Sequence, residues 1–484
     1  MNNDILKLQP NAVWKYFNEI CQIPRPSKKE EKIIEYLLET GKKLGLETKR
    51  DTIGNVLISK PATKGKENIT PVVFQSHVDM VCEKNSDTVF NFETDAIQPY
   101  IDGEWIRAKG TTLGADDGIG MAIALALLED KSLEHGYIEC LFTVDEETGL
   151  SGAFALESGF LKGKMLLNLD SEDEGQFFIG CAGGKDTIVK IDYDQEPVPE
   201  DTLPFLITVK GLKGGHSGDD INKGLGNANK IINRILYAGT YYYDIAIANI
   251  NGGNLRNAIA REANATVLVS KYKSEELVGF VQKVNLIIKE ELRITDPDVN
   301  ITIEKTNMPK YVIDDFVQSD LVDSIYACPH GVLAMSQDIE GFVETSTNLA
   351  SIKMDDKQIT ISTSQRSSVK SKKEDAANMV AALFGLIDAD IEHSDGYPGW
   401  KPNPNSEVLA ILKQAYINLF KKEPQVLAIH AGLECGLIGE KYPQMDMISY
   451  GPTLRGVHSP DERLLIESVS QVWDLTVEFL KILK

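Results

Sequence analysis

The stretch YIECLFTVDEETGL (137–150) places three carboxylates in a row, Asp145, Glu146 and Glu147, directly after an apolar run. A short apolar run of this kind predicts a buried strand. Like charges gathered at the end of a buried strand are costly unless a cation or hydrogen-bond donors neutralise them. The rest of the chain must therefore supply a partner for these acids.

Two further apolar runs also end in side chains that can bind metal ions. The run VVFQSHVD ends in His77 and Asp79, and the run LLNLD ends in Asp170. Open α/β sheets bind their ligands at the carboxyl ends of their strands. These side chains and the acids of 145–147 are therefore predicted to meet at one edge of a sheet.

Two more segments contribute candidate ligands. TTLGADDGIG adds Asp116 and Asp117 at the start of a helix, and RGVHSPDE adds His458 in a loop. Taken singly, each has an ordinary explanation, since an Asp before a helix usually caps it and a lone His is usually a surface or core residue. The combined set holds imidazole and carboxylate without thiolate, which is typical of catalytic zinc, manganese or cobalt sites.

The order of strands and helices predicts an α/β domain with a largely parallel sheet. After about residue 186 the pattern changes to βαββαβ, and a second copy of this order can be read from residue 316. The stretch 394–406 has the Gly, Pro, Asn and Ser content of a hinge, and α/β patterns resume beyond it. We therefore expect a catalytic domain in two segments, 1–186 and 396–484, interrupted by an inserted domain at 187–395.

The composition limits the classes of function. The 484 residues are 42% hydrophobic and 25% charged, as in ordinary globular proteins, and the formal net charge of −22 argues against nucleic acid or an anionic membrane as partner. We see no secretory signal and no run of about 18 apolar residues. The six cysteines are scattered without a C-x-x-C pair, so we expect a cytoplasmic protein.

Other catalytic motifs are absent from the sequence or incomplete. The sequence contains no H-E-x-x-H and no P-loop, and GLSGA (149–153) lacks the last Gly of a nucleophile elbow. The stretch 170–181 imitates a calcium loop, but its twelfth position is Cys181 rather than Glu.

The ordered motifs SHVDM, LGADDGIGMA, DEETG, NLD and GVHSPDE resemble the two-zinc dipeptidase and aminopeptidase superfamily, which includes peptidase T, carnosinases and glutamate carboxypeptidases. The motifs of one dipeptidase subgroup resemble four further stretches, HVDMVCEKN, GGHSGDDI, GYPGWKPNP and HAGLECG. The resemblance covers essentially the whole chain. It implies a zinc-peptidase-like α/β catalytic domain with a mostly parallel central sheet. The inserted segment would then be an α+β lid domain, for which a duplicated βαββαβ unit is one reading.

The resemblance also implies a ligand set for two Zn²⁺ per chain, which Co²⁺ or Mn²⁺ can replace. His77 and Asp170 would bind one ion, and Glu147 and His458 the other. Asp116 would bridge both ions.

The same resemblance implies the remaining roles around the metals. Asp79 would orient His77 from behind, and a cis peptide would link Asp116 to Asp117. Glu146 would be the general base for a metal-activated water. Asp145 has no role in this set and is interpreted either as a strand-end residue or as a residue that supports a ligand from behind.

The inserted segment and the late HAGLECG motif supply candidates for substrate binding. His216 resembles the lid histidine of the family, an oxyanion or substrate contact. Asn254 or Asn257, together with Arg366, are candidates for the terminal carboxylate of the substrate, and Arg suits that group through bidentate pairing. His430 and Glu434 of HAGLECG are placed in the wall of the pocket.

We expect a metal-dependent hydrolase of unblocked dipeptides, Xaa-His among them, with a small peptide as its partner. One alternative is a dizinc amidohydrolase or aminopeptidase acting on N-acyl amino acids or tripeptides. Another is a metal-binding or peptide-binding protein without turnover, which the complete ligand set and Glu146 disfavour. A homodimer stays open: relatives with a short lid pair two chains so that a lid histidine reaches across, whereas a duplicated lid would let His216 serve its own chain.

Overall fold

The apolar run that ends in His77 forms strand β3 (Val72–His77), which is buried along its whole length in a computed structural model that describes residues 4–484. β3 pairs in parallel with β6 (Ile138–Thr143) and with β7 (Met165–Asn168), and β7 pairs in parallel with β23 (Asp446–Ser449). This parallel centre confirms the α/β fold class. It also brings the ends of the three runs that carry candidate ligands to one edge of a sheet.

Antiparallel strands flank this centre, so the sheet is mixed rather than mostly parallel. Its order is β1-β2-β6-β3-β7-β23-β8-β22. The antiparallel pairs are β1 (Glu47–Arg50) with β2 (Val56–Lys60), β2 with β6, and β8 (Gln176–Cys181) with β23. β22 (Gln425–Ile429) lies at the far edge. β1 and β2 are joined by residues 51–55 alone, which is too short for the crossover that a parallel pair requires.

Helices cover this sheet, and one of them is apolar all round. α3 (Ala115–Glu129) buries nearly every residue, as expected of a helix enclosed between the sheet and the rest of the domain, and it packs against β3 and α1. The other helices of this part are α1 (Asn11–Ile20), α2 (Glu31–Leu44), α4 (Glu146–Gly149), α5 (Ser151–Ala155), α10 (Glu407–Phe420), α11 (Glu434–Lys441) and α12 (Ile466–Ile482), with a short 3-10 turn at Ile5–Lys7.

A small antiparallel sheet, which the sequence analysis missed, completes this part of the chain. Its order is β24 (Leu454–Arg455), β25 (Arg463–Leu465), β5 (Trp105–Ala108) and β4 (Pro99–Asp102). The loop between β24 and β25 carries His458, and β5 leads into the segment before α3. The sheet therefore brings the loop that carries His458 close to the start of α3.

The described residues divide into two compact units. The first comprises the chain up to Gly180 together with Trp400–Ala428 and Leu433–Lys484, and the second comprises Cys181–Gly399 with Ile429–Gly432. The roles predicted for 1–186, 187–395 and 396–484, catalytic domain and lid, stay predictions. No helix within residues 4–484 is both long and apolar enough to cross a membrane.

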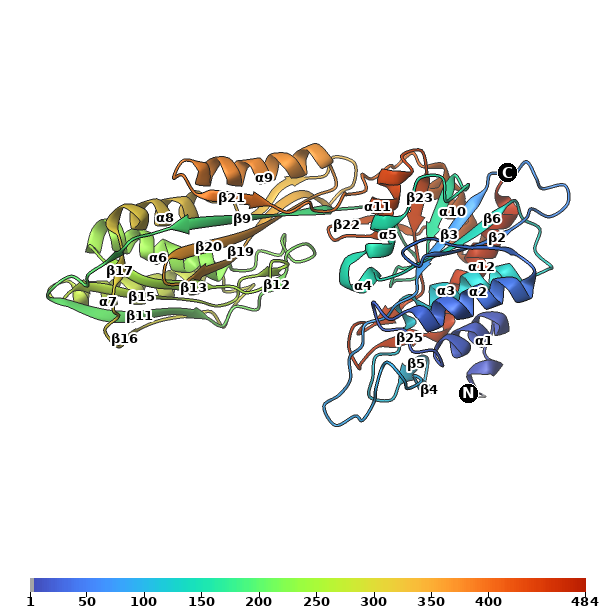
Figure 1. Cartoon of the computed structure of the whole chain (residues 1–484), viewed down its shortest axis with the longest axis horizontal. Helices are drawn as coiled ribbons and strands as arrows, with labels where there is room; N and C mark the ends of the chain where they lie inside the picture. Colours follow the sequence, from blue (N-terminus) through green and yellow to red (C-terminus); the bar gives the residue numbers. More distant parts are fainter. Residues whose placement is uncertain (1–3) are drawn as a thin grey trace. The chain divides into compact units, whose positions relative to one another are not determined.

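The second unit is built on a nine-stranded sheet (Figure 1). Eight of its strands follow the path β16-β11-β15-β13-β19-β20-β9-β21, and the ninth, β18, pairs with β19 beside this path. Its strands and helices are β9 (Gly183–Asp192), β11 (Thr202–Lys210), α6 (Ala228–Tyr243), β13 (Ala246–Gly252), β15 (Ala263–Ser270), α7 (Ser274–Glu291), β16 (Asn300–Lys305), α8 (Asp315–Ala327), β18 (Gly331–Met335), β19 (Val343–Met354), β20 (Gln358–Ser367), α9 (Lys370–Gly385) and β21 (Asp390–His393). Two short pairs lie apart from it, β10 (Gln195–Glu196) with β17 (Val312–Ile313) and β12 (Gly215–His216) with β14 (Ala258–Ile259).

The two halves of this path repeat one topology. In the first half, the chain order β11-α6-β13-β15-α7-β16 gives the sheet order β16-β11-β15-β13. In the second half, β9-α8-β19-β20-α9-β21 gives the equivalent order β21-β9-β20-β19, and the halves meet where Gly252 pairs with Ile352. The duplicated βαββαβ order is therefore present, with the first copy inserted between β9 and α8 of the second.

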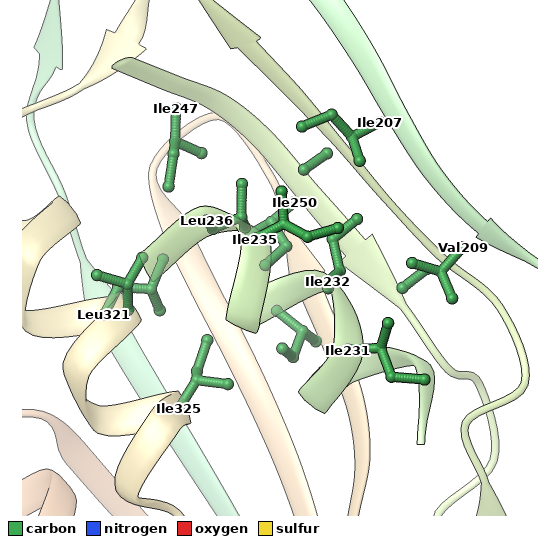
Figure 2. Close-up of a cluster of buried hydrophobic side chains, with 14 of the residues drawn as sticks. Ile207, Val209, Ile231, Ile232, Ile235, Leu236, Ile247, Ile250, Leu321 and Ile325 are labelled. Atoms are coloured by element: carbon green, nitrogen blue, oxygen red, sulfur yellow. The ribbon is translucent and has the colours of Figure 1, made fainter. Parts of the chain in front are cut away.

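The core of the second unit lies where α6 packs on the sheet. Figure 2 shows the isoleucines of α6 beside Ile207 and Val209 of β11 and Leu321 of α8, and all are buried. The sequence pattern predicts a helix over 222–238, but α6 begins later because the side chain of Asn227 accepts hydrogen bonds from the N–H groups of Asn229 and Lys230 and caps it there.

Candidate metal centre

Five predicted ligands converge in the first unit. His77 ends β3, Asp170 follows β7, Asp116 opens α3, Glu147 lies in α4, and His458 lies in the loop between β24 and β25. The donor atoms of His77, Asp116 and Asp170 lie within 4.8 Å of one another, and so do those of Asp116, Glu147 and His458. The structure thus places the five side chains in two groups that share Asp116.

Asp116 presents one carboxylate oxygen to each histidine. Its Oδ1 lies 3.1 Å from Nε2 of His77, and its Oδ2 lies 3.1 Å from Nε2 of His458. Nε2 of His458 is also 3.1 Å from a carboxylate oxygen of Glu147, and Nε2 of His77 is 3.5 Å from one of Asp170. The peptide bond between Asp116 and Asp117 is cis, as the family resemblance implied.

Asp79 lies behind His77 and organises the neighbouring turn. Its carboxylate is 3.4 Å from Nδ1 of His77 and accepts hydrogen bonds from the N–H groups of Glu146 (3.0 Å) and Glu147 (3.2 Å) and from the hydroxyl of Ser27 (2.7 Å). Burial alone would raise the pKa of Asp79, but its interaction with His77 and these donors lower it to about 2. Asp79 therefore stays ionised and directs Nε2 of His77 toward the centre.

Asp145, the first of the three consecutive acids, has a structural role. It lies in the left-handed region at φ 51°, and its carboxylate accepts hydrogen bonds from the hydroxyls of Thr148 and Ser151. It is part of neither group that shares Asp116, although it lies with Glu30 and Asp79 in a further acidic cluster. The turn that it shapes carries Glu146 and Glu147 into the site.

The electrostatics of the centre call for cations. Burial raises the pKa of Asp170 to about 8 and that of Glu146 well above its usual range, and neighbouring carboxylates add to both shifts. Hydrogen bonding to Asp116 and Glu147 raises the pKa of His458 to about 11. Oε1 of Glu147 is buried with no hydrogen-bond partner among the described residues. A crowd of buried carboxylates with an unsatisfied acceptor and two imidazoles fits divalent ions that take nitrogen and oxygen ligands.

Glu434, the first residue of α11, is buried in the same unit. One of its oxygens accepts hydrogen bonds from Gln75 (2.6 Å) and Thr143 (2.8 Å), and the other, Oε1, has no partner among residues 4–484. Burial raises its pKa to about 7. It is close enough to Glu146 and Asp170 to contribute to the raised pKa of each.

In the second unit, His216 and Arg366 lie together, as two predicted substrate contacts would require. An Nη atom of Arg366 is 3.4 Å from Nε2 of His216, its Nε donates to Ser217 (3.2 Å), and its other Nη donates to the hydroxyl of Tyr397 (2.9 Å). Arg366 is only 6% exposed. Within the described part of the chain, no carboxylate lies at ion-pair distance from it, so its charge is free to meet an anion.

The third predicted contact in this unit, Asn257, lies beside His216. His216 pairs with Ala258 across β12 and β14, and the backbone oxygen of Asn257 accepts from the N–H of Ser217 at 2.8 Å. The Asn257 side chain itself is exposed. Tyr397 was not predicted as a site residue, because it lies in the stretch interpreted as a hinge. Its aromatic ring between glycines and prolines was the available signal.

Comparison with known proteins establishes the family. The model of the family described as "Peptidase family M20/M25/M40" matches residues 73–481 of this chain. The chain belongs to this family. It is 45% identical over 479 residues to the cytosol non-specific dipeptidase of Escherichia coli (strain K12), over 99% of each chain. The superfamily resemblance and the prediction of a peptidase are confirmed.

Two solved structures are similar to this chain. The aminoacylhistidine dipeptidase from Vibrio alginolyticus matches with a TM-score of 0.94 at 44% identity, over 99% of this chain and 98% of that one. The aminopeptidase PepT from Bacillus cereus ATCC 10987 matches with a TM-score of 0.58 at 18% identity over 98% of both chains, which shows a likeness of fold alone. The motifs HVDMVCEKN and HAGLECG predict the aminoacyl-histidine dipeptidase subgroup, and the two similarities at 45% and 44% identity confirm this prediction.

Proposed function

We propose that this M20 family member is a cytoplasmic dipeptidase that hydrolyses unblocked dipeptides, Xaa-His among them, at a centre of two Zn²⁺. The observation that carries the proposal is the position of Asp116, with one oxygen toward His77 and the other toward His458. A carboxylate shared in this way suits a bridge between two ions. The names of the relatives in Escherichia coli and Vibrio alginolyticus support the substrate class, and the former supports the compartment.

The side chains around the centre have separate tasks. Two bound ions would supply a water of lowered pKa and positive charge beside the peptide carbonyl. Glu146, whose burial raises its pKa well above the usual range, is suited to accept the proton of that water and to pass it to the leaving amine. Asp79 holds the turn that presents Glu146 and keeps the imidazole of His77 in one orientation.

Glu434 supports a substrate with a free amino terminus. Its unpartnered Oε1 is a buried acceptor, and leaving such an acceptor unsatisfied costs free energy that a substrate ammonium group would recover. An N-acyl amino acid carries no ammonium group at that position. This residue therefore favours the dipeptidase over the N-acyl amidohydrolase.

The second unit supports recognition of the other end of the substrate. Arg366 is a buried cation with no carboxylate at ion-pair distance among residues 4–484, and a terminal carboxylate would balance its charge. His216, held beside it, is proposed to stabilise the oxyanion, and Asn257 to contact the substrate. We infer that residues 187–395 act as a lid, that the duplicated topology lets His216 serve its own chain, and that a homodimer is compatible with this.

A panel of substrates tests the function. Metal-free protein reconstituted with Zn²⁺ is assayed with carnosine, Gly-His, Leu-Gly, a tripeptide and an N-acetyl amino acid. We expect cleavage of the unblocked dipeptides and little or none of the last two, and no activity before zinc is added. Preferential cleavage of the N-acetyl amino acid would favour the amidohydrolase, and zinc binding without cleavage of any substrate would favour a binding protein.

A further inference from the structure

Residues 113–116, which lead into α3 and end in Asp116, are held by a buried carboxylate from elsewhere in the chain. Glu462, which is 2% exposed, accepts hydrogen bonds from four successive N–H groups. These belong to Leu113 (2.7 Å), Gly114 (2.9 Å), Ala115 (2.8 Å) and Asp116 (3.4 Å). One side chain thus binds every backbone N–H group from Leu113 to Asp116, the proposed bridging ligand.

A buried cation, Arg25, holds the same segment by donating hydrogen bonds to backbone carbonyl oxygens. Arg25, also 2% exposed, donates to the carbonyl oxygens of Val78 (2.8 Å), Asp79 (2.5 Å) and Gly114. Gly114 has φ +69°, and a Cβ atom there would lie 2.7 Å from the guanidinium, so this close approach requires glycine. The peptide groups around Gly114 therefore lie between a negative and a positive side chain.

These contacts join the segments that carry three of the proposed ligands. Glu462 follows His458 by four positions in the loop between β24 and β25, so it ties that loop to the one with Asp116. Arg25 ties the residues just after His77 to Gly114. His77 itself ends β3, which is fixed on both sides by parallel pairing with β6 and β7. Asp116 and His458 thus depend on the two charges more than His77 does.

We propose that Glu462 and Arg25 are positioning residues that hold Asp116 in place relative to His458 and thereby set the affinity of the ion held by Asp116, Glu147 and His458. This inference rests on the proposed two-metal function. A carboxylate near the start of a helix also gives ordinary stability. The test must therefore separate metal affinity from stability.

The variant Glu462→Gln keeps the shape of the side chain but replaces one acceptor oxygen by an amide that faces N–H donors. Glu139→Gln is a matched control in the same unit. Glu139 is 1% exposed, and its carboxylate also accepts two backbone N–H groups, those of Lys162 and Gly163 at 2.8 Å each. Glu139 belongs to none of the groups of candidate metal ligands found among residues 4–484.

Metal-free protein is titrated with Zn²⁺ against a chelator of known affinity, and Co²⁺ absorption reports the geometry of each site. We expect two ions in the wild type. In Glu462→Gln one ion should bind as before and the other about 10–100-fold more weakly, the range seen when residues supporting metal ligands are removed. Glu139→Gln should keep both affinities although its thermal stability falls.

Several results would overturn the inference. Two unchanged affinities in Glu462→Gln would do so while leaving the proposed function intact, and so would an equal loss in Glu462→Gln and Glu139→Gln. A wild type that binds a single ion would overturn the two-metal function and the inference with it. If Glu462→Gln does not fold, the same titration of Arg25→Lys decides: selective weakening of one ion supports the role, and unchanged affinities refute it.

Discussion

Asp79 and His77 face each other in the interior of the first unit, with Oδ1 of the carboxylate 3.4 Å from Nδ1 of the imidazole. The same carboxylate accepts the N–H groups of Glu146 and Glu147. One buried acid therefore positions a proposed ligand and the turn that bears the proposed base. The activity and the metal affinity of the centre should both depend on it.

Replacing Asp79 by Asn should lower metal affinity by about 10–100-fold, because the orienting partner of His77 loses its charge. Competition titration with Zn²⁺ measures this. Ser27→Ala is the control, since it removes only the 2.7 Å hydrogen bond from the Ser27 hydroxyl to Asp79 and should change the affinity little. Equal affinities in wild type and Asp79→Asn would mean that the imidazole needs no support.

Substitutions at the adjacent residues Glu146 and Glu147 should separate the role of general base from that of metal ligand. Glu146→Gln should retain both ions and lose about 10²–10⁴-fold in kcat, which is the usual contribution of a general base. Glu147→Gln should instead weaken the ion that it shares with Asp116 and His458. Elemental analysis and steady-state kinetics with Leu-Gly measure the two effects. Near-normal turnover by Glu146→Gln would exclude it as the base.

The cluster in the second unit should affect different kinetic constants. His216→Ala should mainly lower kcat, because an oxyanion contact is stronger in the transition state than in the ground state. Arg366→Lys should mainly raise KM, since lysine cannot form the same bidentate pair with a carboxylate. Neither should release zinc. Arg234→Lys, an exposed arginine paired with Glu291, is the control and should change neither constant.

His430 should make the second unit less stable at mildly acidic pH. It is buried, its Nε2 lies 2.7 Å from the hydroxyl of Ser346, and burial together with the charge of Arg366 lowers its pKa to about 3. Because the folded pKa is below the unfolded value of about 6.5, the stabilising effect is complete above pH 6.5 and is lost as the pH falls from there toward 3.

Denaturant unfolding at pH 7 and pH 5 checks this sign. The wild type should lose up to about 1.4 kcal/mol of unfolding free energy per pH unit more than His430→Gln does, since glutamine cannot be protonated in this range. Parallel pH dependence in the two proteins would show that His430 does not titrate on unfolding.

The convergence of the candidate ligands could be predicted from the sequence because three of them follow the strand-end rule. His77, Glu147 and Asp170 come after apolar runs, and such runs reveal both the strand and the edge at which it ends. The duplicated order of the second unit was visible in part, but its strand β9 was not assigned to the second copy. β9 pairs with β20, which lies far along the chain, and no local pattern encodes such a pairing.

Other features leave no local signal. β24 contains only Leu454 and Arg455, which is too short for a periodic pattern, yet it helps to place His458. Glu462 follows Pro460 and Asp461 and so has the pattern of a surface acid, although folding buries it against four N–H groups. Tyr397 lies among turn residues, and only the tertiary structure brings it to Arg366.

The most direct measurement is the number of zinc ions bound per chain at equilibrium in the wild type and in Asp116→Asn. We expect two ions in the wild type and a single tight ion in the variant, because asparagine offers one acceptor oxygen where the bridge needs two. One tight ion in the wild type that is unchanged in Asp116→Asn, or two ions in both proteins, would contradict the bridge and the mechanism built on it.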